Sequence, residues 1–458
     1  MAGILDTGTA RPFDETQTHG PAYRSLLRQL DAADLGELAE DVQDDLDASG
    51  CGFGADARFV IDPVPRVIDG AEWEPLAAGL RQRADALERF TADVYGAQEI
   101  IEAGVVPRRV LDDCAHYEPR LRGLPVRRWI TVAGLDLVRG ADGRFAVLED
   151  NTRTPSGLAY LLAAREAVSR RVMIPAGARL RDVRGLVGVV RDALLAAAPE
   201  EIANPHAILL TDGPANAAHW EHVTLGEDVG LDAVTADQLV CAGDRLWVRE
   251  PHGRRRVDVV YRRTDQERLY AADGSPTWLS ELLEAPLRAG HLAVVNAFGA
   301  GVADDKLVHA YVEQMVRFYL GEEPQLPSVR TYDLSDDATL AEVLERLDQI
   351  VIKPRAGHGG RGVVIGPHAT PAELAAVREL VVAAPADFVA QDTVLLSEHP
   401  TVADGELAPR HVDLRPFVIS GSRRHVVPGG LTRVALEEGE MIVNSSRNGG
   451  AKDTWVLD

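Results

Sequence analysis

The chain has 458 residues, with 48 basic and 71 acidic side chains and a formal net charge of −23. This acidic balance argues against general nucleic-acid binding, which needs basic stripes to neutralise phosphates. A content of 46% hydrophobic and 26% charged residues is that of a globular protein, long enough for two to four domains at about 150 residues each. Only Lys306, Lys353 and Lys452 are lysines, and each lies beside a Gly, Asp or Pro cluster.

The cysteines and the N-terminus exclude several classes of protein. Cys51, Cys114 and Cys241 are odd in number and far apart, so we expect small buried side chains rather than disulfides or a zinc site. The N-terminus lacks a basic segment followed by an apolar one, and no apolar run approaches roughly 18 residues. We therefore expect a cytoplasmic protein that does not bind membranes.

The first two hundred residues alternate helical and extended patterns. Leucines spaced among acidic residues predict an amphipathic helix over 18–50, and helical periodicity returns over 71–95. Residues 59–68 are too rich in proline for a central strand. Apolar residues around a Gly-Ala-Asp-Gly turn predict a hairpin over 129–151, and helices follow over 157–198.

A parallel α/β sheet is predicted from Pro205 onward, because short apolar strands alternate there with a helix over 216–229. The only dense basic run, Arg254–Arg263, is predicted to form a hairpin with solvated arginines. A helix over 307–319 and a linker over 321–333 follow. The third block contains a helix over 338–347, the strand 349–354, a glycine-rich loop, a helix over 371–383 and further strands. These elements predict mixed α/β blocks over 1–200, 201–328 and 329–458.

The glycine-rich loop is the strongest local signal. The strand QIVIKP ends near Lys353, and four glycines follow within six residues, before a short strand at 363–365. Closely spaced glycines let backbone N–H groups turn toward an anion, and a nearby ammonium adds a point charge. A tight turn needs fewer glycines, so the pattern favours phosphate binding; its members are Gly357, Gly359, Gly360 and Gly362.

The predicted hairpin carries a candidate cation site. If its turn centres on Ala141-Asp142, Asp136 lies opposite Val147 and shares a face with Glu149 and Asn151. Two carboxylates and an amide oxygen suit Mg²⁺, which fills its other sites with phosphates and water. A solvated polar face is the alternative for Glu149 and Asn151 alone. Asp150 is expected to point away and to be structural.

A third polar cluster lies near the C-terminus. Asp413 and Arg415 share a strand face, and further groups that pair with anions follow at Arg433, Asn444, Arg447 and Lys452. Ser445 and Ser446 have no nearby His-Asp arrangement, so a serine nucleophile is not supported.

Together these motifs resemble the circularly permuted ATP-grasp family, related to glutathionylspermidine-synthase-like ligases. The resemblance rests on AGLDLVRG, LEDNTRTPSG, VADDK, the loop after Lys353, RHVDLRPF, GGLTRVAL and the KDTW ending, with Glu149 preceding Lys353 by about two hundred residues. It implies an ATP-grasp fold in permuted order, with a parallel α/β pre-grasp domain at 201–328. That domain would separate the metal-ligand hairpin from the nucleotide-binding half.

The resemblance also implies site residues. ATP phosphates would contact Lys306, Lys353 and the four loop glycines, and the adenine would contact Gln391 and Asp392. Magnesium ligands would be Asp136, Glu149 and Asn151. Catalytic groups facing the γ-phosphate or an acyl-phosphate would be Arg415 and Arg433. Lys452 is expected to reach the same pocket, with an exposed tail lysine as the alternative.

The activity implied is that of an ATP-dependent carboxylate–amine ligase, which acts through an acyl-phosphate with Mg²⁺-ATP. Two alternatives stay open: an ATP-dependent phosphotransferase, and a nucleotide-binding module without turnover. The partners would be a small-molecule or peptide carboxylate and an amine. Candidate substrate contacts follow from the rule that ligands bind at the carboxyl ends of parallel strands; they are Asp212, Gly213, Pro214, Asn216, Glu221 and Arg262.

Overall fold

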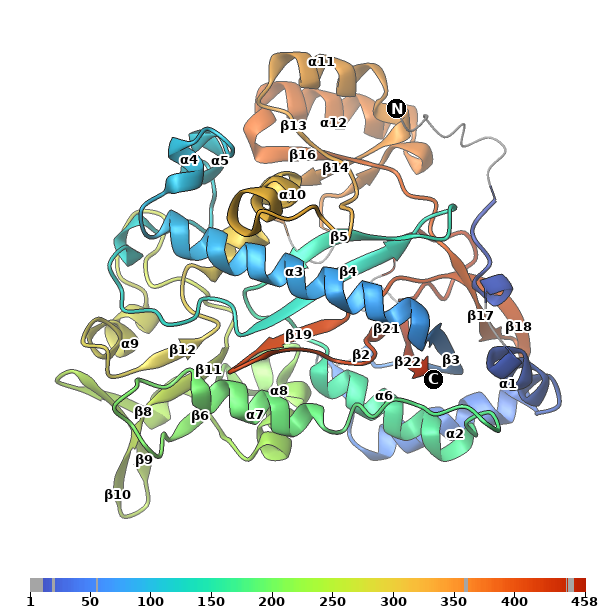
Figure 1. The fold of residues 1–458 in the computed structure, drawn as a ribbon, viewed down its shortest axis with the longest axis horizontal. Coiled ribbons are helices and arrows are strands. Elements are labelled where there is room, and N and C mark those ends of the chain that lie inside the picture. The colour runs from blue at the N-terminus through green and yellow to red at the C-terminus, as the bar shows by residue number, and fades with distance from the viewer. Residues whose placement is uncertain (1–10, 19–20, 55–56, 358–360, 442, 444–448) are drawn as a thin grey trace.

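The computed structural model describes residues 11–18, 21–54, 57–357, 361–441, 443 and 449–458 (Figure 1). The helix expected over 18–50 is two helices, α1 (Pro21–Asp31) and α2 (Leu35–Ala48). They are separated at Asp34, whose carboxylate caps α2 by accepting a hydrogen bond from the Glu37 amide at 3.1 Å. The long helix α3 (Gly70–Val94) matches the helical pattern seen in the sequence.

Two sheets at the centre of the molecule join the two ends of the chain. One has the order β20-β19-β4-β5 and the other β21-β22-β3. Because β3 lies at a sheet edge, its prolines interrupt no second ladder, as the sequence indicated. The strands are β3 (Ile61–Asp69), β4 (Val132–Arg139), β5 (Phe145–Asn151), β19 (Phe417–Ser420), β20 (Arg424–Val426), β21 (Leu431–Val434) and β22 (Gly450–Leu457).

A four-stranded parallel sheet of order β12-β11-β6-β7 confirms the α/β pattern of the middle of the chain. Its strands are β6 (Ala207–Thr211), β7 (Asp232–Val234), β11 (Val259–Arg263) and β12 (Ala293–Val295), and helices α7 (Leu186–Ala196), α8 (His219–Val229) and α9 (Trp278–Arg288) pack nearby. The predicted hairpin at 254–263 is only half right. Residues 253–257 form β10, whereas Arg262 and Arg263 lie buried in β11.

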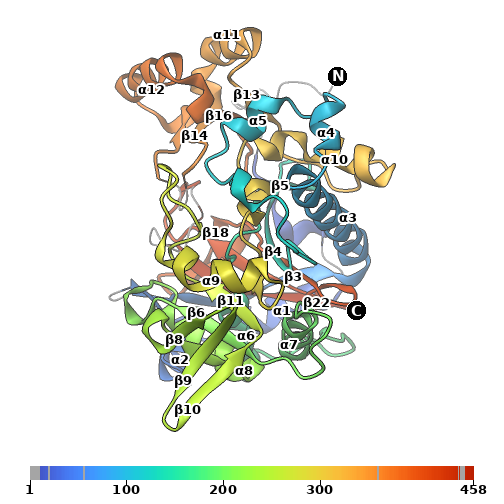
Figure 2. The ribbon, with the colours of Figure 1, turned by 90° about the vertical axis from the view of Figure 1, so that its left-hand side faces the viewer.

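A separate antiparallel sheet of order β13-β16-β14-β15 carries two helices on one face. Its elements are β13 (Thr331–Asp333), α11 (Asp337–Glu345), β14 (Ile350–Pro354), β15 (Val364–Ile365), α12 (Pro371–Ala383) and β16 (Phe388–Asp392). Figure 2 shows this unit at one end of the molecule, with the parallel sheet toward the other end. The glycine-rich loop connects β14 to β15, as the sequence predicts.

The remaining elements surround these sheets: β1 (Gly52–Phe53), β2 (Ala57–Arg58), α4 (Glu99–Glu102), α5 (Arg108–Asp112), α6 (Leu158–Arg171), β8 (Leu239–Ala242), β9 (Arg245–Glu250), β10 (Gly253–Val257), α10 (Val312–Met315), β17 (Glu398–Ala403) and β18 (Glu406–His411). The helix expected over 307–319 is a 3₁₀ turn, α10 and a π-helical turn in succession. Cys51 and Cys114 are buried as expected, whereas Cys241 is partly exposed.

Strand pairing brings the ends of the chain together. β19 pairs with β4, and β22 pairs in parallel with β3, so segments near residues 60, 135, 420 and 455 form one structure. The predicted block boundaries at 200 and 328 stay a prediction. In the described part of the chain, no helix is long and apolar enough to cross a membrane.

Candidate active site

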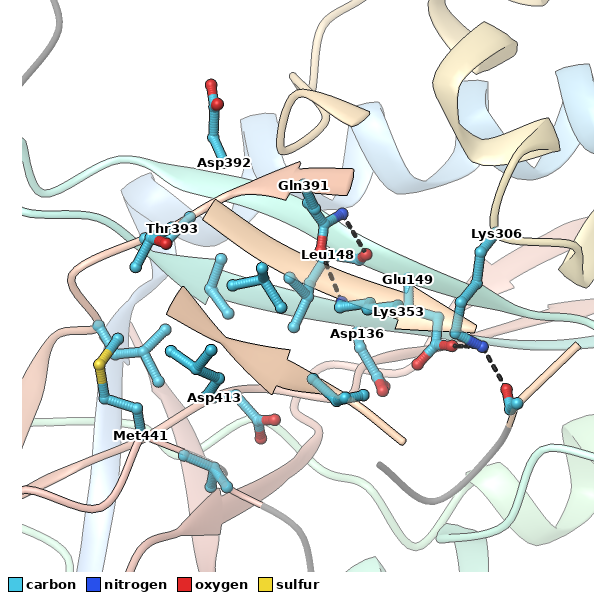
Figure 3. A pocket seen from close by; sticks show the side chains of 18 of the residues that line it. Asp136, Leu148, Glu149, Lys306, Lys353, Gln391, Asp392, Thr393, Asp413 and Met441 are labelled. Atoms are coloured by element: carbon cyan, nitrogen blue, oxygen red, sulfur yellow. Dashed lines mark hydrogen bonds and ion pairs between the residues drawn. The ribbon is translucent and has the colours of Figure 1, made fainter. Parts of the chain in front are cut away.

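A cavity separates the β4–β5 hairpin from the sheet that contains β14 and β16 (Figure 3). Apolar side chains from both sides line one part of it, and lysines, arginines and carboxylates line the rest. Such a division suits a ligand with a flat apolar ring and an anionic tail. The apolar lining includes Val138, Leu148, Val351, Ile365, Val394 and Met441.

The register of the hairpin differs from the expected one. Asp136 lies directly opposite Glu149, and Leu137 lies opposite Val147, because a β-bulge shifts the pairing between these positions. The turn is therefore displaced from the centre that the Gly-Ala-Asp-Gly pattern suggested. The bulge nevertheless keeps Asp136 and Glu149 on one face. Asn151, opposite Gly134, lies two residues further along the same face.

Two arginines hold Asp136. Arg415 donates to both of its carboxylate oxygens at 2.6 and 2.7 Å, and Arg433 donates to Oδ2 at 2.9 Å. Burial disfavours the charged carboxylate, but the two guanidinium groups outweigh it and lower the pKa of Asp136 to about 2. Asp136 is therefore an anion at neutral pH, and three groups that are distant in the sequence form one cluster.

Asp413 is a fourth member of this cluster. The single N–H of Arg433 Nε is shared between the two Asp413 carboxylate oxygens, each at 2.9 Å, and the Asp413 side chain lines the cavity. Burial raises the pKa of Asp413, with Asp136 acting in the same direction and Arg433 opposing it. The sequence placed Asp413 on the strand face of Arg415, but nothing local indicated that it shares Arg433 with Asp136.

Lys353 lies on β14 and points into the cavity (Figure 3). Its ammonium donates to Gln391 Oε1 at 2.6 Å, and Gln391 in turn donates to the Leu148 carbonyl and the Thr331 hydroxyl. Burial, together with the nearby Lys306, lowers the pKa of Lys353 to about 8, although Glu149 opposes this shift. Lys353 is thus a desolvated cation with no carboxylate in direct contact among the described residues.

Lys306 connects the two sides of the cavity. Its ammonium lies 3.1 Å from Glu149 Oε1 and donates to the Gly357 carbonyl at the start of the glycine-rich loop. The side chain is only 13% exposed. Lys306, which follows the parallel sheet and precedes the β13-β16-β14-β15 sheet in the chain, therefore links the β4–β5 hairpin to the glycine-rich loop.

Gly362, at the end of the loop, has a conformational reason to be glycine. Gly362 has φ +71°, and an added Cβ would lie 2.9 Å from Pro354 Cγ. Gly357 lines the cavity, together with Arg361. Gly359 and Gly360 lie outside the described residues, so their expected phosphate contacts stay a prediction.

Gln391 and Asp392, expected beside the adenine, differ in orientation. Both residues line the cavity, but the Asp392 carboxylate accepts a hydrogen bond from the Tyr332 hydroxyl at 2.9 Å. Figure 3 shows this carboxylate pointing away from the lysines. The Asp392 carboxylate is thus engaged by Tyr332 rather than directed at the lysines.

Lys452 does not reach this cavity, which corrects the expectation from the sequence. Its side chain is completely buried in β22, pairs with Asp62 and donates to the Pro400 carbonyl at 2.9 Å. The alternative of an exposed tail lysine is equally wrong. Because β22 is the middle strand of its sheet, Lys452 and its neighbours belong to the protein interior.

Asp150 has the structural position that the alternation of the strand predicts. It is buried, and Arg83 donates to both of its oxygens at 2.6 and 2.7 Å. His309 Nδ1 lies 2.7 Å from Oδ2. Despite burial, Arg83 and His309 keep the pKa of Asp150 well below its usual value. Adjacent acidic residues, Glu149 and Asp150, thus face the cavity and the core respectively.

The donor set fits a magnesium–nucleotide complex. Asp136 and Glu149 line the cavity, and the Glu149 side chain is 29% exposed. Asn151 is not among the lining residues; its amide nitrogen is buried without a hydrogen-bond partner in the described structure, and only its amide oxygen could ligate a cation. The described residues include no cluster of three or more His, Cys, Asp or Glu side chains that could hold a metal ion. A cation here would therefore depend on phosphate oxygens as well as on Asp136, Glu149 and Asn151.

The candidate substrate contacts of the middle region are mostly engaged by the protein. Glu221 is buried and accepts hydrogen bonds from the amides of Gly157 and Ala159 at the start of α6. Arg262 is buried and donates to the Gln266 carbonyl at 3.2 Å. Asn216 donates to Asp212 and Asp265 in a polar turn that follows β6. Glu221 and Arg262 thus make structural contacts within the protein.

Comparison with known proteins identifies the family. A sequence profile described as circularly permuted ATP-grasp type 2 matches residues 65–435. The chain belongs to this family. A protein of Frankia alni named "Putative glutamate--cysteine ligase 2-3" is 43% identical over 99% of this chain. An uncharacterized protein of Mycobacterium tuberculosis is 41% identical over 96% of this chain and 82% of its own length.

The two Frankia proteins are longer than this chain, so their names describe more than the part that this chain matches. The chain spans 54% of the Frankia alni protein and of a similar protein from Frankia casuarinae, about half of each. Among solved structures, a glutathione synthetase-like effector of Globodera pallida in its apo form matches with a TM-score of 0.58. The two chains are 12% identical in sequence, and the match covers 97% of this chain and 100% of the effector chain. This likeness supports the mixed α/β fold in permuted ATP-grasp order and nothing finer.

Proposed function

We propose that the chain is an ATP-dependent carboxylate–amine ligase that binds Mg²⁺-ATP between the β4–β5 hairpin and the β14–β16 sheet. The observation that supports this most strongly is the meeting of Lys306, Lys353 and Glu149 in one cavity with three members of the Asp136 cluster: Asp136, Asp413 and Arg433. Two ammonium groups can neutralise the phosphates, and the apolar part of the cavity can hold the adenine. Family membership supports the use of ATP.

In the proposed reaction, a carboxylate oxygen of the substrate attacks the γ-phosphorus and ADP leaves, which gives an acyl-phosphate. An amine nitrogen then attacks the acyl carbon, inorganic phosphate leaves, and the amine loses a proton. This chemistry requires positioned cations rather than a protein nucleophile. Magnesium, held by the hairpin donors and the phosphates, would neutralise the charge that develops on the transferred group.

The arginine pair has a defined part in this proposal. Arg415 and Arg433 both pair with Asp136, and Arg433 pairs with Asp413 as well. With Asp136 among the residues that would hold magnesium, the two guanidinium groups would be placed to neutralise charge on the transferred phosphoryl group. The arginines would therefore have two roles, orienting Asp136 and stabilising the charged intermediate.

Hydroxylamine separates the ligase from the phosphotransferase. Purified protein is incubated with Mg²⁺-ATP, hydroxylamine and pools of amino acids, peptides or dicarboxylic acids, and ADP and hydroxamate are measured together. A ligase yields hydroxamate and ADP in equal amounts, because hydroxylamine intercepts the acyl-phosphate. ADP with a phosphorylated, non-carboxylate acceptor would instead favour the phosphotransferase. Glu149→Gln serves as the inactive control, and ATP binding with no turnover in any pool would favour a binding module.

A further inference from the structure

A second cavity, of about 420 Å³, lies beside β12, the edge strand of the parallel sheet. Its wall comes from residues 124–128, residues 197–202, the β9–β10 hairpin and residues 287–298. None of these residues lines the nucleotide cavity. Its volume falls within the roughly 300–1,000 Å³ that is typical of small-molecule sites.

The floor of this cavity is apolar. Leu287 comes from the end of α9, and Leu292, Val294 and Phe298 come from β12 and its flanks. These four side chains are each less than 10% exposed, so their positions are set by packing against the core. A ligand body that contacts this floor would gain from removing apolar surface from water.

The rim is rich in cations. Arg127 pairs with the exposed Glu200 at 3.1 Å, and Arg256 pairs with the buried Asp258 at 2.6 Å. The other two arginines hydrogen-bond to a carbonyl and an imidazole: Arg128 donates to the Gly421 carbonyl at 3.0 Å, and Arg245 lies 3.4 Å from His291 Nε2. Arg128 also interacts with the Glu88 carboxylate over a longer distance, and His291 Nδ1 lies 3.1 Å from Asp244 Oδ2. Neither arginine has a carboxylate within 4.0 Å among the described residues. The exposed Glu201 is the remaining acidic group at the rim.

Arg128 and Arg245, both partly exposed, lack a direct carboxylate partner among the described residues and differ in this respect from Arg127 and Arg256, the rim arginines that pair with carboxylates. Arg128 and Arg245 come from segments more than one hundred residues apart, yet both line the same cavity. Together they provide a place for an anionic group beside an apolar floor.

We propose that this cavity binds a small organic anion. Its oxyanion group contacts Arg128 and Arg245, and its apolar body packs against β12 and the end of α9. The site is separate from the nucleotide site and does not depend on the ligase assignment. In Figure 1 it belongs to the region where α9, β12 and the projecting β9–β10 hairpin meet.

A fluorescent anion tests this proposal in the full chain. The probe is 8-anilinonaphthalene-1-sulfonate, titrated in the presence of saturating Mg²⁺-ATPγS, and its neutral counterpart is N-phenyl-1-naphthylamine. We expect one saturable sulfonate site. Arg128→Ala and Arg245→Ala should each weaken sulfonate binding by about tenfold, because each removes a charge-assisted hydrogen bond. The neutral probe should be unaffected by either change.

The matched control is Arg249→Ala, which removes the same charge from an exposed position on β9 that does not line the cavity. It should leave sulfonate binding unchanged. Equal loss in all three variants would overturn the proposal, since it would indicate only a general charge effect. Binding that Arg128→Ala and Arg245→Ala leave intact would overturn it as well. Thermal melts of each variant show whether it folds, and Arg245→Gln tests the same loss of charge with a side chain closer in size to arginine.

Discussion

Raising the pH from 7 to 9 should weaken nucleotide binding about tenfold through one residue. The pKa of Lys353 is lowered to about 8 by burial and by Lys306. Its ammonium is therefore about 90% protonated at pH 7 and about 10% protonated at pH 9. If the phosphates require the charged form, the apparent affinity follows the protonated fraction. Bound phosphate favours the ammonium, so binding near pH 8 should also take up about half a proton.

Isothermal titration calorimetry with Mg²⁺-ATPγS measures both effects. Titrations at pH 7, 8 and 9, in pairs of buffers that differ in ionisation enthalpy, give the affinity and the proton uptake. Lys353→Arg is the control. Because its guanidinium stays charged from pH 7 to 9, the part of the pH dependence of binding that comes from the Lys353 ammonium should be absent in this variant. A wild-type affinity that is constant from pH 7 to 9, or that falls equally in Lys353→Arg, would refute this reasoning.

Two further predictions concern buried and cavity-facing charges. Glu149→Gln should abolish ATP turnover and leave the urea unfolding midpoint unchanged. Asp150→Asn should instead lower the free energy of unfolding by about 3 kcal/mol, because it weakens the buried ion pair between Asp150 and Arg83. Equal destabilisation of the two variants in urea melts would contradict the assignment of opposite faces. Lys452→Ala should also cost about 3 kcal/mol, since Asp62 would stay buried without its partner. A Lys452→Ala protein as stable as wild type but inactive would instead place Lys452 in the site.

Local patterns in the sequence predict the elements that surround the cavity. The hairpin, the strand carrying Lys353 and the helix after the glycine-rich loop each depend on neighbouring residues, whose periodicity and turn chemistry are readable directly. The common face of Asp136 and Glu149 was also predicted, although through a different register. The bulge between them could not be foreseen, because it depends on how both strands pack in the sheet.

Contacts between distant residues account for the errors. Lys452 lies in a Gly-Ala-Lys-Asp sequence that resembles a loop, yet it forms an ion pair with Asp62, which is 390 residues away. Arg262 and Arg263 belong to a basic run that suggests a solvated surface, but both are buried in β11, where they pair in parallel with Leu210 and Thr211 of β6. In both cases tertiary pairing overrides the local composition.

The most direct test of the proposed nucleotide site is a crystal structure with Mg²⁺-ATPγS. We predict the adenine among the apolar side chains near Val351 and Met441, and the terminal phosphate beside Lys306 and Lys353. A magnesium ion should lie about 2.1 Å from an oxygen of Glu149. Nucleotide bound elsewhere, for example in the cavity beside β12, or bound in this cavity with its phosphates away from both lysines, would contradict the account.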